Sequence, residues 1–208
     1  FAAEEAADIA RDAPDRNYPD PTHKPELIVA LEELWALKGF RSPEAITDLF
    51  RRANMASAEP LLEMLAGPGG LREFFSALLA LDQGQITNLL TELACGLGNL
   101  PEAEARWSQG LLARYPRDQG ATAALVLQLV RLEAGQGLFL GAGELHSYLR
   151  GTGLEIMANS DTVLRGGLTP KHVDPQELMR VLRFEHTPVQ ILEAQGNGLV
   201  RHYEAPCD

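Results

Sequence analysis

The middle third of the chain repeats hydrophobic residues at the spacing of an amphipathic helix. Ser42 and Pro43 are typical of a helix start, because serine caps the first turn and proline has no N–H to lose there. Breaks follow at residues 67–70, 96–99 and 115–116, which are rich in glycine and proline. The recurring residues are Ile46, Leu49, Phe50 and Ala53, then Leu71, Phe74, Phe75, Leu78 and Leu79, then Ile86, Leu89, Leu90 and Leu93. This pattern predicts a bundle of short helices, followed by one helix that is apolar almost all round over residues 121–132.

Short apolar runs bounded by glycine follow the helical region. Residues 137–140 read Gly-Leu-Phe-Leu, which is too short and too apolar for a surface helix and predicts a strand. His146 comes after a glycine-containing turn, and in an extended strand it shares one face with Glu144 and Tyr148 while leucines occupy the other. This alternation predicts a half-filled β-barrel with a polar side. Alone, such a histidine is more often a hydrogen-bonded core residue than a metal ligand.

The two ends of the chain have a different composition. Three prolines fall within residues 18–26, Tyr-Pro-Asp-Pro-Thr-His-Lys-Pro-Glu, so this segment is extended or turning. Lys24 and Glu26 then point to one side, as a solvated ion pair also would. Asp174-Pro175 predicts a last helix that ends near Phe184, and residues 187–208 alternate as a further strand region would.

Composition and charge limit the possible partners. The chain has 208 residues, of which 45% are hydrophobic and 23% charged, as in an ordinary globular protein. Its formal net charge of −11 argues against nucleic acid and anionic membrane surfaces as partners. An anionic small molecule would therefore need a local cationic pocket. No apolar run reaches the roughly 20 residues of a membrane span.

The cysteines and the first residues bear on the compartment and on completeness. Cys95 and Cys207 lie far apart, which supports neither a disulfide framework nor a cysteine-based zinc site, so we expect a reducing cytoplasm. The chain starts at Phe1 with no initiating methionine and no signal peptide. We therefore expect it to be an internal part of a longer protein.

Two blocks of the sequence resemble a known family. Residues 18–26 are similar to the signature Tyr-x-Asp-x-Asn-His-Lys-Pro-Glu of the type I mannose-6-phosphate isomerases, with Thr22 in place of asparagine. Residues 143–149 and 155–171 are similar to the family's block around its zinc histidine and active-site arginine, with Thr162 replacing an asparagine. The glycine spacing before His146 also resembles the second motif of cupin barrels, although Gly141 stands where cupins usually have proline.

The resemblance implies a set of site residues. It implies one Zn²⁺ per active site with Glu26 and His146 as metal ligands, Arg165 as a catalytic residue, and substrate contacts by Lys24, Lys171, Tyr148 and Asp161. The family's other two zinc ligands, spaced Gln-x-His before the first block, do not occur in this chain, and we expect them before Phe1. Most of the family's C-terminal domain is also expected beyond the chain.

The general base is chosen less directly. Glu155 is our prediction, because it follows the histidine strand closely and starts an apolar segment whose burial suits a base. Asp161 and His23 remain candidates. Each has a structural alternative: Glu155 as an ion-pair partner of Arg165, Asp161 as a turn residue, and His23 as a hydrogen-bonding neighbour of the site.

Together these observations predict an α+β multi-domain protein. A cupin, or jelly-roll β-barrel, is expected in two segments, residues 1–40 and 125–183, with an inserted all-α domain at 41–124 and the start of a C-terminal β domain at 184–208. The expected function is zinc-dependent isomerisation of mannose 6-phosphate and fructose 6-phosphate through an enediol, by a monomer that binds a phosphosugar. The alternatives are a non-catalytic metal- or sugar-binding cupin and a helical interaction module. A barrel without its first strands would expose sheet edges, which predicts poor solubility of the isolated segment.

Overall fold

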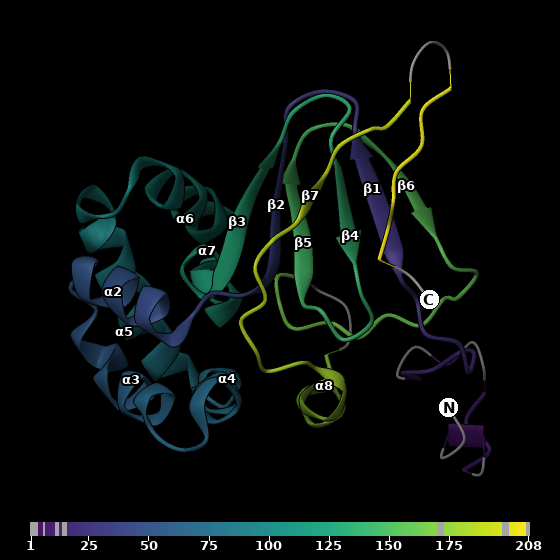
Figure 1. Ribbon diagram of the computed structural model, residues 1–208. Helices are drawn as coiled ribbons and strands as arrows, with labels where there is room; N and C mark the ends of the chain where they lie inside the picture. Colours follow the sequence, from purple (N-terminus) through teal and green to yellow (C-terminus); the bar gives the residue numbers. More distant parts are fainter. Residues whose placement is uncertain are drawn as a thin grey trace.

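The computed structural model describes residues 4–5, 7–10, 13, 16–169, 173–196 and 200–206. A group of helices lies on one side of the molecule and antiparallel β-sheets on the other, with one later helix below the sheets in the view of Figure 1. The described helices contain no segment long and apolar enough to cross a membrane.

The helical part begins where the sequence predicted it. The Ser42 hydroxyl accepts a hydrogen bond from the Ala45 N–H at 3.2 Å, and Pro43 is the first residue of the helix. The apolar faces of the helices form one buried cluster that includes Phe40, Phe50 and Phe74. The helices are α2 (Pro43–Arg52), α3 (Glu59–Ala66), α4 (Gly70–Leu79), α5 (Gln83–Gly96), α6 (Glu102–Arg114) and α7 (Ala123–Val126), with the 3₁₀ turns η1 (Ala56–Ala58), η2 (Leu97–Asn99) and η3 (Gln119–Thr122).

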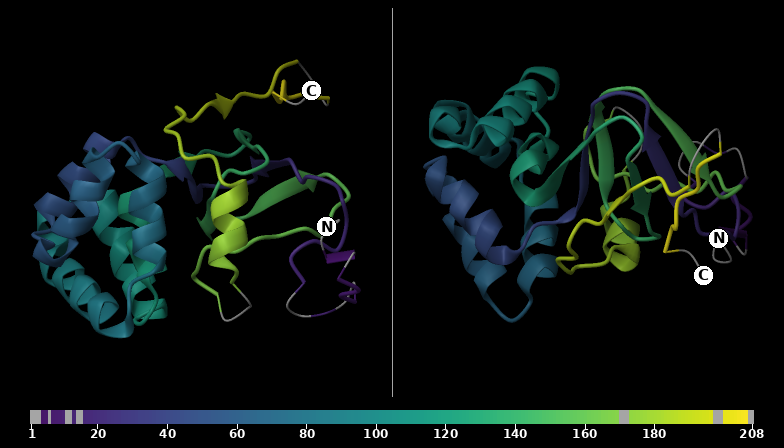
Figure 2. Two further views of the ribbon diagram at one scale, coloured as in Figure 1. Left: turned by 90° about the horizontal axis from the view of Figure 1, so that it is seen from below. Right: turned by 45° about the horizontal axis from the view of Figure 1, so that its top comes forward.

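Two antiparallel sheets combine strands from before and after the helices. In the first sheet the order is β6 (Gly153–Met157), β1 (Glu26–Ala30), β4 (Gly137–Leu140) and β7 (Ile191–Leu192). In the second it is β3 (Leu127–Leu132), β2 (Leu34–Phe40) and β5 (His146–Arg150). Figure 2 shows the two sheets in two further views. A chain that leaves the sheets after β2 therefore returns to both of them.

A second apolar core fills the space between the sheets. In β1, buried residues alternate with half-buried ones, so Glu26 points the same way as Ile28 and Ala30. Glu26 is only 9% exposed and lies at the end of this inward-facing row. The cluster consists of Ile28, Ala30, Leu34, Ala36, Val130, Leu132, Leu138 and Leu140. A carboxylate is thus built into the interior edge of an otherwise apolar core.

The helix predicted over residues 121–132 was wrong. Only η3 and the single turn of α7 are helical, and β3 takes the second half of the run. β3 pairs with β2 from Leu34 opposite Leu132 to Phe40 opposite Leu127. A continuous apolar run suits a strand buried on both faces as well as a helix, and here pairing with β2 decides between them.

The last helix, α8 (Pro175–Val181), is also shorter than predicted. The Asp174 carboxylate caps it by accepting a hydrogen bond from the Glu177 N–H at 3.0 Å. Phe184 lies beyond the helix and stacks on Phe40 with ring centroids 5.7 Å apart. The apolar residue that suggested a longer helix therefore packs against the helical core instead.

Candidate active site

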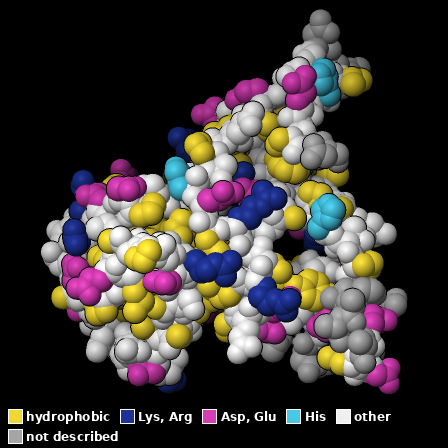
Figure 3. Space-filling view, turned by 60° about the horizontal axis from the view of Figure 1, so that its bottom comes forward, with side chains coloured by type: hydrophobic (Ala, Val, Ile, Leu, Met, Phe, Trp, Pro, Cys, Tyr) yellow, Lys and Arg dark blue, Asp and Glu magenta, His cyan; other side chains and the backbone are white. Residues whose placement is uncertain are grey.

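A cavity of about 590 Å³ opens where the sheets, the helical part and α8 meet. Its lining includes Lys24, Glu26, His146 and Arg165, together with apolar side chains from α4 and α8 such as Phe75 and Val181. Figure 3 shows Lys and Arg side chains gathered around a hollow on the lower face of the molecule. Residues distant in the sequence, but predicted together, therefore line one space.

Glu26 is the centre of a small group of charged and polar side chains. Its Oε2 lies 3.2 Å from His146 Nε2, and its Oε1 lies 3.3 Å from Lys24 Nζ. Glu26 comes from β1 in one sheet and His146 from β5 in the other. Lys24 reaches the same carboxylate because two residues of extended chain separate side chains on one face.

The orientation of the His146 ring follows from its second nitrogen. Nδ1 lies 2.9 Å from the Glu144 carbonyl oxygen, which can only accept a hydrogen bond, so Nδ1 carries the proton. Nε2 is then the nitrogen with a free lone pair in the neutral ring, and it faces Glu26. A backbone carbonyl that fixes the ring through one nitrogen is the usual arrangement behind a metal-binding histidine.

The Glu26–His146 pair fits part of a zinc site. Zinc binds imidazole nitrogen and carboxylate oxygen at about 2.0–2.2 Å, so two neighbouring ligands of a tetrahedral ion lie roughly 3.4 Å apart. The observed separation of 3.2 Å is close to this value. The set is half of a four-ligand site, since among the residues described here no group of three or more His, Cys, Asp and Glu side chains could hold a metal.

A second ion pair, which the sequence did not suggest, supports the histidine turn. Lys38 is 9% exposed and pairs with His146 across the strands β2 and β5. Its Nζ lies 3.6 Å from Glu144 Oε1, and Glu144 Oε2 accepts a hydrogen bond from the Gly141 N–H at 2.6 Å. The Glu144 side chain therefore ties together both ends of the turn whose carbonyl orients His146.

Arg165 enters the cavity from a segment without helix or strand. Its guanidinium donates a long hydrogen bond of 3.4 Å to the Val163 carbonyl. In the described part of the chain we find no ion pair between Arg165 and a carboxylate, so the suggested Glu155–Arg165 pair is absent there. A cation without a fixed counter-ion beside a cavity is suited to bind an anionic ligand.

Glu155 and Tyr148 contact each other and do not line the cavity. The Tyr148 hydroxyl donates a hydrogen bond of 2.5 Å to Glu155 Oε1 and so joins the two sheets. Burial, and then the hydrogen bond and negative charge of Glu155, raise the pKa of the Tyr148 hydroxyl. Glu155 lies opposite Ile28 on the inward face, which makes it the diagonal neighbour of Glu26, roughly 7 Å away.

Asp161 lies at the surface, and its neighbour Asp20 holds the loop in place. The Asp161 N–H donates to Asp20 Oδ2 at 2.8 Å, and the Ser160 hydroxyl lies 2.8 Å from Asp20 Oδ1. Slight desolvation opposes the effect, but hydrogen bonds from Thr22, Ser160 and Asp161 hold the pKa of Asp20 below its usual range. Lys171 lies outside the described residues.

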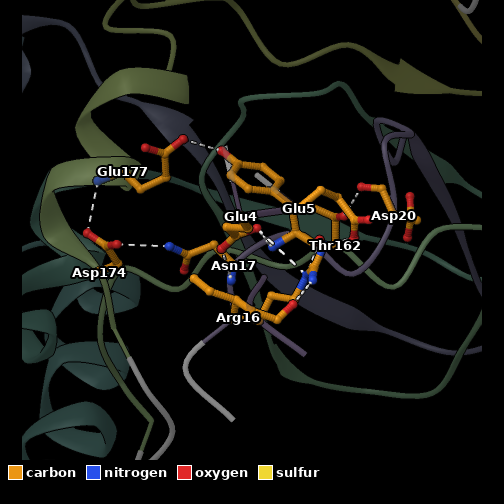
Figure 4. A network of polar contacts seen from close by, with 10 residues as sticks. Glu4, Glu5, Arg16, Asn17, Asp20, Thr162, Asp174 and Glu177 are labelled. Carbon is orange, nitrogen blue, oxygen red and sulfur yellow. Dashed lines mark hydrogen bonds and ion pairs between the residues drawn. The ribbon is translucent and has the colours of Figure 1, made fainter. Parts of the chain in front are cut away.

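The first extended segment also contacts α8 (Figure 4). The Tyr18 hydroxyl donates a hydrogen bond of 2.6 Å to Glu177, and Asn17 Nδ2 donates one of 2.8 Å to Asp174. Burial, followed by the Glu177 hydrogen bond, raises the pKa of Tyr18. Residues 17–20 therefore contact the chain on both sides of Arg165, a role that only the short spacing of Tyr18 and Asp20 in the first block could have suggested.

The chain resembles curated proteins over most of its length. It is 39% identical over 198 residues to the mannose-6-phosphate isomerase of Escherichia coli K12, covering 94% of this chain and 50% of that protein. It is 35% identical over 203 residues to a probable mannose-6-phosphate isomerase of Dictyostelium discoideum, covering 92% and 45% respectively. The chain thus spans about half the length of the curated relatives it matches. A scan of protein-family models gave no match.

Solved structures give the same result for the fold. The apo form of mannose 6-phosphate isomerase from Salmonella typhimurium superposes with a TM-score of 0.90 at 36% identity, over 100% of this chain and 54% of that one. The enzyme from the same organism bound to its substrate fructose 6-phosphate and to zinc gives a TM-score of 0.89 at 34% identity, with the same coverage. The fold, the two sequence blocks and these relatives agree, and the chain belongs to the mannose-6-phosphate isomerase family.

Proposed function

We propose that this chain supplies about half of a zinc-dependent isomerase that interconverts mannose 6-phosphate and fructose 6-phosphate. The observation that carries the proposal is the Glu26–His146 pair, 3.2 Å apart, in one cavity with Lys24 and Arg165. The same cavity combines metal-ligand chemistry with cations in a protein of net charge −11. A phosphosugar needs both.

In this proposal Glu26 Oε2 and His146 Nε2 hold the zinc ion. Two further ligands come from sequence outside these 208 residues, as the greater length of the relatives allows. When bound, zinc supplies a Lewis acid that polarises the oxygens on C1 and C2 of the sugar. The Glu144 carbonyl keeps the imidazole in the tautomer that leaves Nε2 free for the metal.

The protein's own groups move the proton and hold the charge. Glu155 removes a proton from C2 of the aldose and returns it to C1, while a proton passes between the two oxygens of the enediol. Its place beside Glu26 on the inward face puts it within reach of a sugar at the metal. Tyr148 donates to Glu155 and keeps its own proton in doing so, which orients the carboxylate.

The cations bind the negative parts of the substrate. Arg165 stabilises either the enediolate or the phosphate through a bidentate hydrogen bond. Lys24, with Lys171 as a further candidate, contacts the sugar phosphate, and Asp161 keeps a substrate-binding role only if substrate draws its loop inward. His23 lines the cavity and remains an alternative base.

The proposal extends to the architecture and the setting of the protein. Strands from residues 26–40 and 127–192 form one cupin barrel, and the helices between them are an insert domain with the boundaries predicted above. We further propose a monomeric cytoplasmic enzyme that contacts neither nucleic acid nor membrane.

The test is turnover of mannose 6-phosphate by the natural protein that contains this chain, with Arg165→Ala beside wild type. We expect kcat/KM to fall about 10²- to 10³-fold, as for the loss of one transition-state donor. Arg52→Ala is the matched control, since Arg52 pairs with Asp48 on an exposed helix face. Wild-type protein that binds fructose 6-phosphate but never converts it would favour the non-catalytic sugar-binding alternative.

A further inference from the structure

The loop that carries Arg165 is held from the helical part of the molecule. We define the arginine loop as residues 163–169, which contain neither helix nor strand. The Asp118 Oδ2 accepts a hydrogen bond from the Leu168 N–H at 2.7 Å, and its Oδ1 accepts one from the Gly120 N–H at 2.7 Å. Asp118 lies between α6 and η3, so a single carboxylate connects the end of the helices to the arginine loop.

The backbone on both sides of this contact leaves little freedom. Gly167 has a φ of +130° and Leu168 a φ of +57°, so the loop takes a left-handed turn that Leu168 adopts only when it is held there. A Cβ on Gly167 would lie 3.0 Å from Asp118 Oδ1, and one on Gly120 would lie 2.9 Å from Leu168 Cγ. The two segments therefore approach as closely as glycine permits.

The side chain of Leu168 adds an apolar anchor to the polar one. It packs against a buried cluster of the helical part. The buried members of this cluster are Ile86, Leu90, Leu111, Ala121 and Ala124. The turn after Arg165 is thus fixed by one hydrogen bond to Asp118 and by one side chain packed among the helices.

Arg165 itself has little else to fix its direction. Its one hydrogen bond in the described structure is the 3.4 Å contact with the Val163 carbonyl inside the same loop. The place of its guanidinium in the cavity therefore depends on the backbone of the arginine loop. Asp20 holds the residues before the loop, at Ser160 and Asp161, whereas Asp118 holds the residues directly after Arg165.

We infer that Asp118 is a positioning residue for Arg165, through which the helical part sets the anion-binding geometry of the cavity. The inference rests on the proposed function in taking Arg165 as the group that binds the anionic sugar. It adds a role for the helices, which otherwise carry none of the predicted chemistry.

A double-mutant cycle on ligand binding tests this role. The Kd for fructose 6-phosphate is measured by calorimetry in the natural protein that contains this chain, for wild type, Asp118→Ala, Arg165→Ala and the double variant. We expect Asp118→Ala to weaken binding about tenfold in wild type and less than about twofold in the Arg165→Ala background, because groups that act as a unit are not additive. Asp118→Asn, which keeps one acceptor oxygen, should lie between wild type and Asp118→Ala.

Amide hydrogen exchange gives a readout that needs no ligand. Exchange at Leu168 should accelerate in Asp118→Ala and Asp118→Asn, while Asp48→Ala on the exposed face of α2 should leave it unchanged. Equal losses of affinity in both Arg165 backgrounds, or unchanged exchange at Leu168, would overturn the role of Asp118 and leave the isomerase proposal standing. Binding without turnover by wild type would instead overturn the isomerase proposal and leave the cycle readable.

Discussion

Glu26 and His146 reach the same point of the interior from two different sheets. Each is kept there by its neighbours: Glu26 by the inward row of β1, and His146 by the carbonyl of Glu144. The Glu144 side chain accepts a hydrogen bond from Gly141 and pairs with Lys38, so the turn before His146 has little freedom. At the scale of single residues, the proposed metal site depends on the turn as much as on its ligands.

Replacing Glu144 should therefore weaken metal binding without removing a ligand. We expect Glu144→Ala to lower the zinc affinity of the natural protein about tenfold, the usual cost of losing a partner behind a ligand. Competition with a chromophoric chelator measures the affinity. Glu63→Ala, at an exposed position of α3, is the control. Zinc affinity equal to wild type in Glu144→Ala would show that the turn holds His146 without this side chain.

The Tyr148–Glu155 hydrogen bond predicts a dependence of stability on alkaline pH. The folded state raises the pKa of Tyr148, so its stabilising effect is fully present below the unfolded value of about 10 and is lost as the pH rises toward the folded value. Tyr148→Phe should lower the free energy of unfolding by about 1 kcal/mol at pH 7. In urea unfolding this gap should shrink above about pH 10. A gap that is constant with pH would contradict the assignment.

Individual residues were predicted well where local geometry was enough. Lys24 and Glu26 lie on one side because the prolines keep the segment extended, and His146 begins a strand after a glycine turn. The partner of Glu155 was not predicted, because Tyr148 meets it across two sheets whose register no local pattern contains. Asp118 was missed for the same reason, since its partner Leu168 lies on a distant segment.

At the scale of elements, an irregular segment connects the site to α8. Residues 16–20 have no regular structure, yet they contact the loop before Arg165 through Asp20 and α8 through Asn17 and Tyr18. Proline keeps this segment from folding back on itself, so its polar groups face other segments. Side-chain hydrogen bonds here take the place of strand pairing.

Asp20→Asn should loosen this connection in a manner that depends on acid pH. The folded state lowers the pKa of Asp20, so its contribution is present above the unfolded value of about 3.9 and is lost as the pH falls through the folded value. We expect a lower melting temperature than wild type at pH 7, and a difference that closes as the pH falls below about 4. Asp48→Asn, on an exposed helix face, is the control. A difference that persists in strong acid would show that the effect is not one of charge.

The wrong helix at residues 121–132 shows what periodicity leaves open. The segment contains too few polar residues to distinguish a buried helix from a buried strand. Pairing with β2 satisfies the backbone of the six residues of β3, which would otherwise have to continue α7. By contrast, α2 and α5 were predicted well, because Ser42 and the capping box of Asp82 with Gln85 are signals contained in neighbouring residues.

At the scale of the whole molecule, the sheets have an exposed apolar edge. In the described structure β6 pairs on one side only, with β1, and its outward side chains Leu154 and Ile156 are 58% and 60% exposed. Such an edge can pair with another chain. Because no described strand covers this edge, the 208-residue chain alone should associate in solution.

Ile156→Lys should reduce this association, because a charged side chain on an edge strand opposes pairing. Sedimentation velocity of the 208-residue chain at several concentrations is the measurement. We expect wild type to shift toward larger species as the concentration rises and Ile156→Lys to shift less. Val200→Lys, which alters an exposed apolar residue outside the sheets, is the control. A wild-type chain that stays monomeric would contradict the prediction.

Zinc-dependent turnover with His146 as a ligand is the central claim, and one measurement addresses it directly. Zinc content and isomerisation of mannose 6-phosphate are followed in the natural protein that contains this chain, before chelation, after chelation and after zinc is restored. We predict that activity follows zinc content in wild type and in His202→Ala, and that His146→Ala neither retains zinc nor recovers activity. Full turnover by metal-free protein, or by His146→Ala, would contradict the account.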